Sequence, residues 1–117
     1  MDYRSAQPML IVEKYERVIA YLYPIIQNTP RKHGVARDRF LTCLFDQVDL
    51  ITTAGKTQQI SGLYKADANL AMLRFYMRFF REQLRAMTPR QEEVAQSMIA
   101  ETGKLLGAWI SKKQKGN

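Results

Sequence analysis

The sequence predicts an all-α protein, an up-down-up-down bundle of four helices in a single domain spanning residues 1–117. Three observations predict this fold class. Apolar residues recur at steps of three and four in four segments, no segment alternates as a strand does, and short turn-rich connections separate the segments. A chain of 117 residues with 46% hydrophobic and 25% charged residues also has the usual size and composition of one globular domain.

The first two helices are predicted from apolar stripes and from the turn residues that separate them. The first helix is expected at about 9–27 and the second at about 35–54. The apolar stripe of the first consists of Ile11, Tyr15, Val18, Leu22 and Ile25, and that of the second of Leu41, Leu44, Val48 and Ile51. Residues 28–34 form the connection, and Gly55 is expected to end the second helix in a left-handed conformation.

The third helix, expected at about 59–86, gives the clearest signal. Its seam follows heptad spacing and consists of Leu63, Ala66, Leu70, Leu73, Met77, Phe80 and Leu84. A fourth helix is expected at about 89–112, because Thr88 and Gln91 have the spacing of a capping box around Pro89. Its seam consists of Ala95, Met98, Thr102, Leu105 and Trp109, and residues 112–117 form a basic tail. Gly103 and Gly107, one turn apart, are expected to let another helix approach closely.

The third helix carries more apolar surface than one bundle requires. Met72, Phe75, Tyr76 and Phe79 lie on one side of its seam. A neighbouring helix of the same bundle would cover the nearer of them, but Phe75 and Phe79 together favour an interface between subunits. The sequence therefore predicts a homo-oligomer of closed symmetry, without giving the number of subunits.

The other side of the third helix carries a band of arginines. Arg74, Arg78, Arg81 and Arg85 step by four, three and four residues, and further basic residues cluster in the first connection, namely Arg31, Lys32, Arg37 and Arg39. The net charge of +7 favours polyanionic partners, and guanidinium groups form paired hydrogen bonds with phosphate or carboxylate. Two alternatives stay open: a solvated charged face, or ion pairs with acidic residues of adjacent helices.

The sequence shows no catalytic, metal-binding or cofactor-binding pattern. His33 reads as a residue of the first connection, Cys43 as a small buried group beside a seam, and Asp46 with Asp49 as an acidic face. An arginine-lined, mutase-like enzyme remains a minor alternative, because its site would need arginines from several helices. The single cysteine and the lack of a signal peptide or membrane span predict a cytosolic protein without a membrane association.

Four segments of the chain carry a resemblance to a known family. They are Tyr15-Glu16-Arg17-Val18-Ile19 with Tyr21-Leu22-Tyr23-Pro24, residues 30–37, Leu70-Ala71-Met72-Leu73-Arg74-Phe75, and Leu105-Leu106-Gly107-Ala108-Trp109-Ile110. With them, the chain resembles the accessory variability determinant (Avd) family, the helper proteins of diversity-generating retroelements in bacteria and their phages. The resemblance covers nearly the whole chain, and the last two segments are its most specific parts.

The resemblance implies a function as well as a fold. It implies a homopentameric barrel with a positive surface that binds nucleic acid, template RNA and possibly DNA, and associates with the reverse transcriptase of the retroelement. Such a protein is not an enzyme; it supports mutagenic cDNA synthesis in the cytosol of a bacterium or of a phage-infected host. Arg74 and Arg78 match the basic positions of the family's third helix, whereas residues 82–86 depart from the family pattern. Two alternatives are a scaffold that binds no nucleic acid and a related bundle protein encoded in ribosomal RNA intervening sequences.

Overall fold

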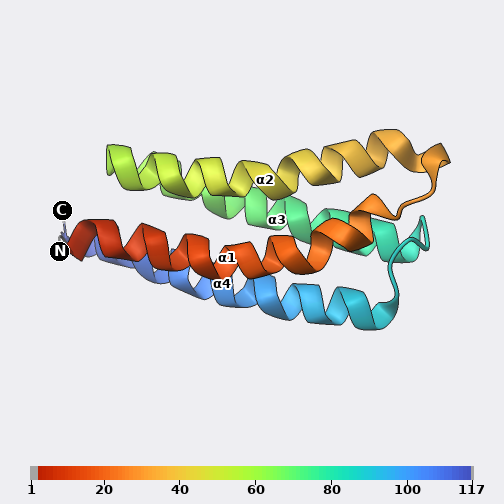
Figure 1. Cartoon of the computed structure of the whole chain (residues 1–117). Coiled ribbons are helices and arrows are strands. Elements are labelled where there is room, and N and C mark those ends of the chain that lie inside the picture. The colour runs from red at the N-terminus through yellow and green to blue at the C-terminus, as the bar shows by residue number, and fades with distance from the viewer. Residues whose placement is uncertain (1–2, 117) are drawn as a thin grey trace.

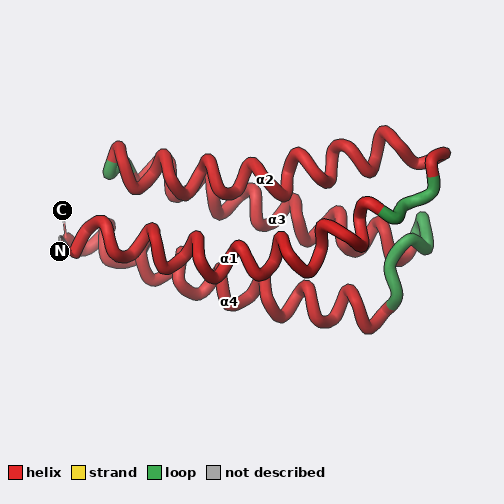
Figure 2. The backbone as a smooth tube through the Cα atoms, viewed as in Figure 1, coloured by secondary structure: helices red, strands yellow, loops and turns green. Residues whose placement is uncertain are grey.

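The computed structural model describes residues 3–116, with side chains described from Pro8 onward. The helices are α1 (Tyr3–Gln27), α2 (Gly34–Thr57), α3 (Ile60–Glu82) and α4 (Pro89–Gly116), and the 3-10 turn η1 (Arg31–His33) precedes α2. Figure 2 shows helices and short connections only, and no strand occurs within residues 3–116. The prediction of an all-α, four-helix fold is confirmed.

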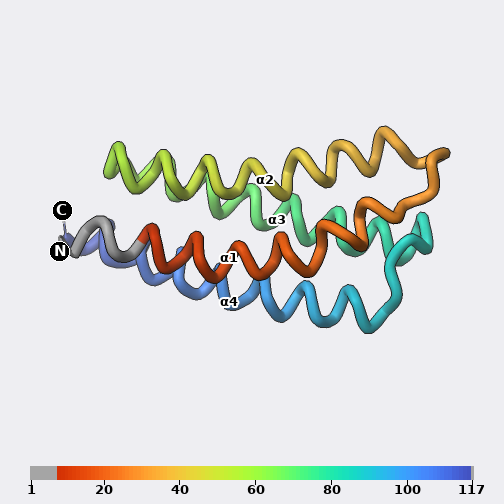
Figure 3. Tube along the Cα trace, viewed as in Figure 1, coloured from red at the N-terminus to blue at the C-terminus, as the bar shows by residue number. Residues whose placement is uncertain are grey.

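The helices form an elongated bundle measuring 47 × 23 × 23 Å along its principal axes. Helix α1 packs against α2 and α4, and α3 packs against the same two helices. Successive helices run in opposite directions (Figure 1), as predicted for an up-down-up-down bundle. Figure 3 shows that residues 28–33 and 83–88 lie at the same end of the bundle, opposite the α2–α3 turn. These two connections are called the loop end below.

The core follows the predicted seam most closely in α3. The six seam residues inside this helix are all buried: Leu63, Ala66, Leu70, Leu73, Met77 and Phe80. Each step of three or four residues keeps a side chain on the face toward the bundle axis. Leu84, the last predicted member, lies beyond the end of α3 and is half-buried.

The other three helices bury faces that are slightly rotated from the predicted ones. In α1 the fifth buried position is Ile26 and not Ile25. In α4 Ile99 and Leu106 are buried, whereas the predicted Met98 and Leu105 are half-buried. In α2 the buried set beside Leu44 and Ile51 consists of Phe40, Cys43, Gln47 and Ala54, in place of Leu41 and Val48. Adjacent apolar residues compete for one core position, and packing between helices decides which is buried.

The second helix ends three residues later than predicted. Gly55 stays helical, and Gln58 is the left-handed residue, with φ at 59° and its N–H donating to the Ala54 carbonyl. The reason for a glycine at position 55 is close packing, because a Cβ there would lie 2.8 Å from Cγ of Pro8. The prediction of a left-handed Gly55 is therefore wrong.

The third helix ends four residues earlier than predicted, at Glu82. The chain then reverses through a turn in which Ala86 donates its N–H to the Phe80 carbonyl, and Arg85 between them has a φ of 55°. This reversal brings Met87 into the core, where it is 5% exposed. Closing the core at the loop end therefore stops α3 although the apolar spacing continues.

The fourth helix begins as predicted and ends later. Thr88 Oγ1 accepts a hydrogen bond from the Gln91 N–H, and Gln91 Oε1 accepts one from the Thr88 N–H, which is the reciprocal capping box. The helix continues to Gly116, so the residues predicted as a basic tail are helical through that position. A Cβ built at Gly107 would meet no atom of another segment of this chain within 4 Å, and a Cβ at Gly103 would make only ordinary contacts. Neither glycine is required for close helix packing within the bundle.

A buried polar group links α2 to α3. The Cys43 thiol lies 3.2 Å from Oδ1 of Asn69, whose amide donates to the Cys43 carbonyl and to Gln47 Oε1. Burial raises the pKa of the Cys43 thiol to about 11, so the thiol stays protonated near neutral pH. The interpretation of Cys43 as a small buried group agrees with this position.

Candidate nucleic-acid interface

Arg74 and Arg78 lie on the side of α3 that faces α4. The Arg74 guanidinium lies over Gly103, since a Cβ built there would be 3.9 Å from Nη2, and Arg78 is exposed. Among the described side chains, neither arginine has a carboxylate within ion-pair distance. The two guanidinium groups therefore stand one helical turn apart with their charge uncompensated.

Arg81 belongs to a different environment, although it continues the same spacing. Its side chain pairs with Glu82 at 2.8 Å and, through Nε, with Glu92 of α4. Glu92 is 13% exposed, and the hydrogen bond that Arg81 donates to it raises the pKa of the Arg81 guanidinium above its ordinary value. The alternative of internal ion pairs thus describes Arg81, which links α3 to α4.

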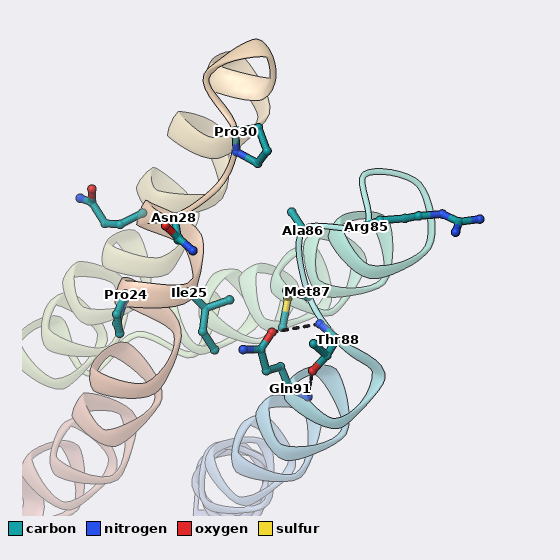
Figure 4. A pocket seen from close by; sticks show the side chains of 10 residues that line it. Pro24, Ile25, Asn28, Pro30, Arg85, Ala86, Met87, Thr88 and Gln91 are labelled. Carbon is teal, nitrogen blue, oxygen red and sulfur yellow. Dashed lines mark hydrogen bonds between the residues drawn. The ribbon is translucent and has the colours of Figure 1, made fainter.

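Arg85 does not lie on the helical band, so the prediction that it extends the band on α3 is wrong. It follows the end of α3 and takes the left-handed position that glycine usually fills after a helix. Figure 4 shows its side chain pointing away from the pocket that its backbone borders. Its exposed guanidinium is part of the loop end.

The basic residues of the first connection also divide into two groups. Arg31 and Lys32 are exposed in η1, and no carboxylate among the described side chains pairs with them. Arg37 contacts Asp38 at 3.1 Å. Pro30 and Arg85 border one pocket, so Arg31, Lys32 and Arg85 all lie at the loop end. The lysines of residues 112–115 lie at the opposite end of the bundle (Figure 1) and do not extend this surface.

The predicted interface residues lie on the side of α3 that faces α2. Met72 is 46% exposed and Phe75 is 43% exposed, whereas Tyr76 and Phe79 are half-buried. The Tyr76 ring stacks on Phe40 with centroids 5.4 Å apart, and Phe75 stacks on Phe79 at 5.8 Å. Helix α2 thus covers Tyr76 and Phe79, the part of the apolar surface nearest to the seam, as expected for a neighbouring helix of the same bundle. Met72 and Phe75 remain accessible.

A match to a family model covers most of this architecture. The model described as bAvd-like matches residues 9–113, which includes all of α2 and α3, the loop end and most of α1 and α4. The chain belongs to the bAvd-like family. This membership confirms the resemblance read from the sequence and makes the chain an Avd-type accessory protein. No curated protein matches the chain at a significant level.

Residues 3–116 contain no group of three or more His, Cys, Asp or Glu side chains placed to hold a metal ion. No helix in the described part of the chain is both long and apolar enough to cross a membrane.

Some residues that border the apolar side of α3 and the loop end could not be predicted from the sequence. Val35, 79% exposed, lines an open groove of about 570 Å³ together with Met72, Phe75, Tyr76 and Phe79, and Arg39, which was expected among the basic residues of the first connection, borders the same groove. Asn28 and Gln91 border the pocket at the loop end. No local pattern could identify them, because each surface combines segments more than 30 residues apart in the chain.

Proposed function

We propose that this protein is an accessory protein of a diversity-generating retroelement, which binds nucleic acid and associates with the reverse transcriptase during mutagenic cDNA synthesis from template RNA. Family membership supports the retroelement role. The observation that carries nucleic-acid binding is the pair Arg74 and Arg78, two adjacent guanidinium groups without carboxylate partners in the described chain. Each can bind a phosphate with two parallel hydrogen bonds.

The proposed contacts are to the backbone of the nucleic acid rather than to its bases. Arginines along one helix side can follow successive phosphates, which gives affinity without base specificity and a strong dependence on salt. Arg31, Lys32 and Arg85 extend the proposed contact at the loop end. Arg37 and Arg81 are weaker candidates, since each is paired with a carboxylate of this chain.

We also propose that the single four-helix domain assembles as a homopentamer, as its family implies. Exposed Met72 and Phe75, with half-buried Tyr76 and Phe79, supply apolar surface for the subunit interface. A ring would repeat the arginine pair in every subunit, and multivalent contact would raise the affinity for a long polyanion. The protein would act beside the polymerase in the cytosol of a bacterium or of a phage-infected host.

The test is a charge reversal of both arginines, Arg74→Glu with Arg78→Glu. We expect binding to RNA or DNA, to the reverse transcriptase, or to both, to fall by more than about tenfold, while circular dichroism and light scattering show unchanged helicity and assembly. A matched control reverses two exposed cations elsewhere, Arg17→Glu with Lys104→Glu. Unchanged binding of the first variant to both partners would overturn the assignment of this surface.

A scaffold without nucleic-acid binding is the second candidate, and one observation favours it. Arg81 of the predicted band serves an internal contact to Glu92. If the wild-type protein assembles normally but binds no nucleic acid even at low salt, the remaining arginines have no phosphate role. That result would select the scaffold.

A further inference from the structure

An open pocket lies at the loop end and has no place in the backbone contacts proposed above. Its volume is about 820 Å³, and it lies between the end of α1 and the α3–α4 connection (Figure 4). The lining residues are Pro24, Ile25, Gln27, Asn28, Pro30, Arg85, Ala86, Met87, Thr88 and Gln91. None of them is acidic, so the pocket suits a neutral or anionic ligand.

The pocket combines apolar walls with carboxamide groups. Pro24, Ile25 and Pro30 supply apolar surface from the α1 side, and the side chains of Asn28 and Gln91 are directed into the space from its two sides (Figure 4). Gln91 uses Oε1 to cap α4, which leaves its Nε2 free to donate. The side-chain carboxamide of Asn28 makes no hydrogen bond with any residue the structure describes, whereas its backbone N–H donates to the carbonyls of Pro24 and Ile25.

The surroundings of the pocket are cationic. Exposed Arg31 and Lys32 follow Asn28 along one connection, and Arg85 stands on the other. The carboxylates nearest to them in sequence are already paired, Asp38 with Arg37, Glu82 and Glu92 with Arg81, and Glu93 with Arg90. A ligand with a planar, hydrogen-bonding part and adjacent negative charge matches this arrangement.

We propose that this pocket binds an unpaired nucleotide of a single-stranded nucleic acid, with the base between the apolar walls and the flanking phosphates on Arg31 and Lys32. A carboxamide offers both a donor and an acceptor to a base edge, as Asn and Gln side chains do in sequence-reading proteins. A duplex cannot enter, because its base edges are paired and stacked. The proposal rests on the proposed function and adds a base-dependent site to its backbone contacts.

The test combines Asn28→Ala and Gln91→Glu in one chain and compares this double variant with wild type. Fluorescence anisotropy measures the binding of both proteins to short single-stranded oligonucleotides and to a duplex of equal length. Gln91→Glu keeps the acceptor that caps α4, so the fold is retained, while it replaces the amide donor with a negatively charged carboxylate. We expect single-strand binding to weaken by about tenfold, with duplex binding unchanged. The control for added negative charge is Gln83→Glu, an exposed position on the α3–α4 connection that does not border the pocket.

An abasic oligonucleotide provides the second arm. Wild type should bind it about tenfold more weakly than the base-bearing strand, and the double variant should bind both strands equally. Running the comparison with RNA and with DNA identifies which strand supplies the nucleotide, and base dependence in either one supports the pocket. Equal wild-type affinity for abasic and base-bearing strands of both kinds, or an unaffected double variant, would overturn it. Failure of wild type to bind any nucleic acid would instead reject nucleic-acid binding itself, and this pocket with it.

Discussion

Two arginines, Arg74 and Arg78, lie within α3, and two more, Arg81 and Arg85, lie near and beyond its C-terminal end, and the two pairs have different surroundings. Arg74 and Arg78 face α4 without carboxylates, whereas Arg81 is held by Glu82 and Glu92 and Arg85 lies beyond the helix end. The same spacing thus gives arginines with three different surroundings. Arg74 and Arg78 are available to a partner, Arg81 is a structural cation that links α3 to α4, and Arg85 lies on the α3–α4 connection. The difference teaches that the spacing of the arginines does not by itself decide the availability of their charges, which also depends on the carboxylates of the neighbouring helix and on where α3 ends.

The largest expected effect on stability comes from reversing the structural cation. Arg81→Glu places three carboxylates together, with Glu92 largely buried among them. We expect the melting temperature to fall by roughly 5 to 10 °C, measured by circular dichroism. Arg78→Glu, three residues earlier on an exposed position, is the matched control and should change it by less than about 2 °C. Equal effects of the two reversals would remove the distinction between the pairs.

A second prediction concerns the position of Arg74 over Gly103. A Cβ at Gly103 would lie 3.8 Å from Leu70 Cδ1 and 3.9 Å from Arg74 Nη2, both ordinary contact distances. Gly103→Ala should therefore stabilise the protein by about 1 kcal/mol through helix propensity, as urea unfolding would measure, and leave nucleic-acid binding intact. Gly55→Ala is the contrasting control and should destabilise, because its Cβ would meet the Pro8 ring at 2.8 Å. A loss of stability in Gly103→Ala would mean that Arg74 packs more tightly there.

The sequence predicts the parts of the fold that depend on one helix at a time. The six seam positions of α3 and the capping box at Thr88 and Gln91 follow from local spacing, and both are confirmed. The end of α3 could not be predicted in this way, because the apolar spacing continues through Leu84. What ends the helix is the burial of Met87, which closes the core from a connection.

The candidate site shows the same division. Spacing alone places Arg74, Arg78 and Arg81 on one side of α3, but the contact of Arg81 with Glu92 exists only because α4 packs there. Likewise, Asn28 and Gln91 border one pocket although they lie 63 positions apart in the sequence, since 91 − 28 = 63. Contacts between distant segments decide which side chains remain available for a partner.

Arg85 gives a third, smaller prediction that separates strain from function. Its φ of 55° favours glycine, so Arg85→Gly should stabilise the protein by roughly 0.5 to 1 kcal/mol, whereas Arg85→Ala should leave stability nearly unchanged. Both variants remove the guanidinium, and both should weaken nucleic-acid binding equally. Urea unfolding and anisotropy on the same samples measure the two effects. Binding that falls only in the glycine variant would assign the loss to the connection's flexibility.

The smallest predicted effect tests the two carboxylates that hold Arg81. Glu82 is 49% exposed on the same helix, whereas Glu92 is 13% exposed on α4, so their contacts with Arg81 differ in solvent screening. Glu82→Gln should therefore lower the melting temperature by less than about 2 °C, and added salt should abolish the change. Glu92→Gln should lower it further and keep most of its effect in salt, because it weakens the contact between α3 and α4. If the two variants responded alike, Arg81 would be a surface cation like Arg78, and the arginines of α3 would form a single available band up to the helix end.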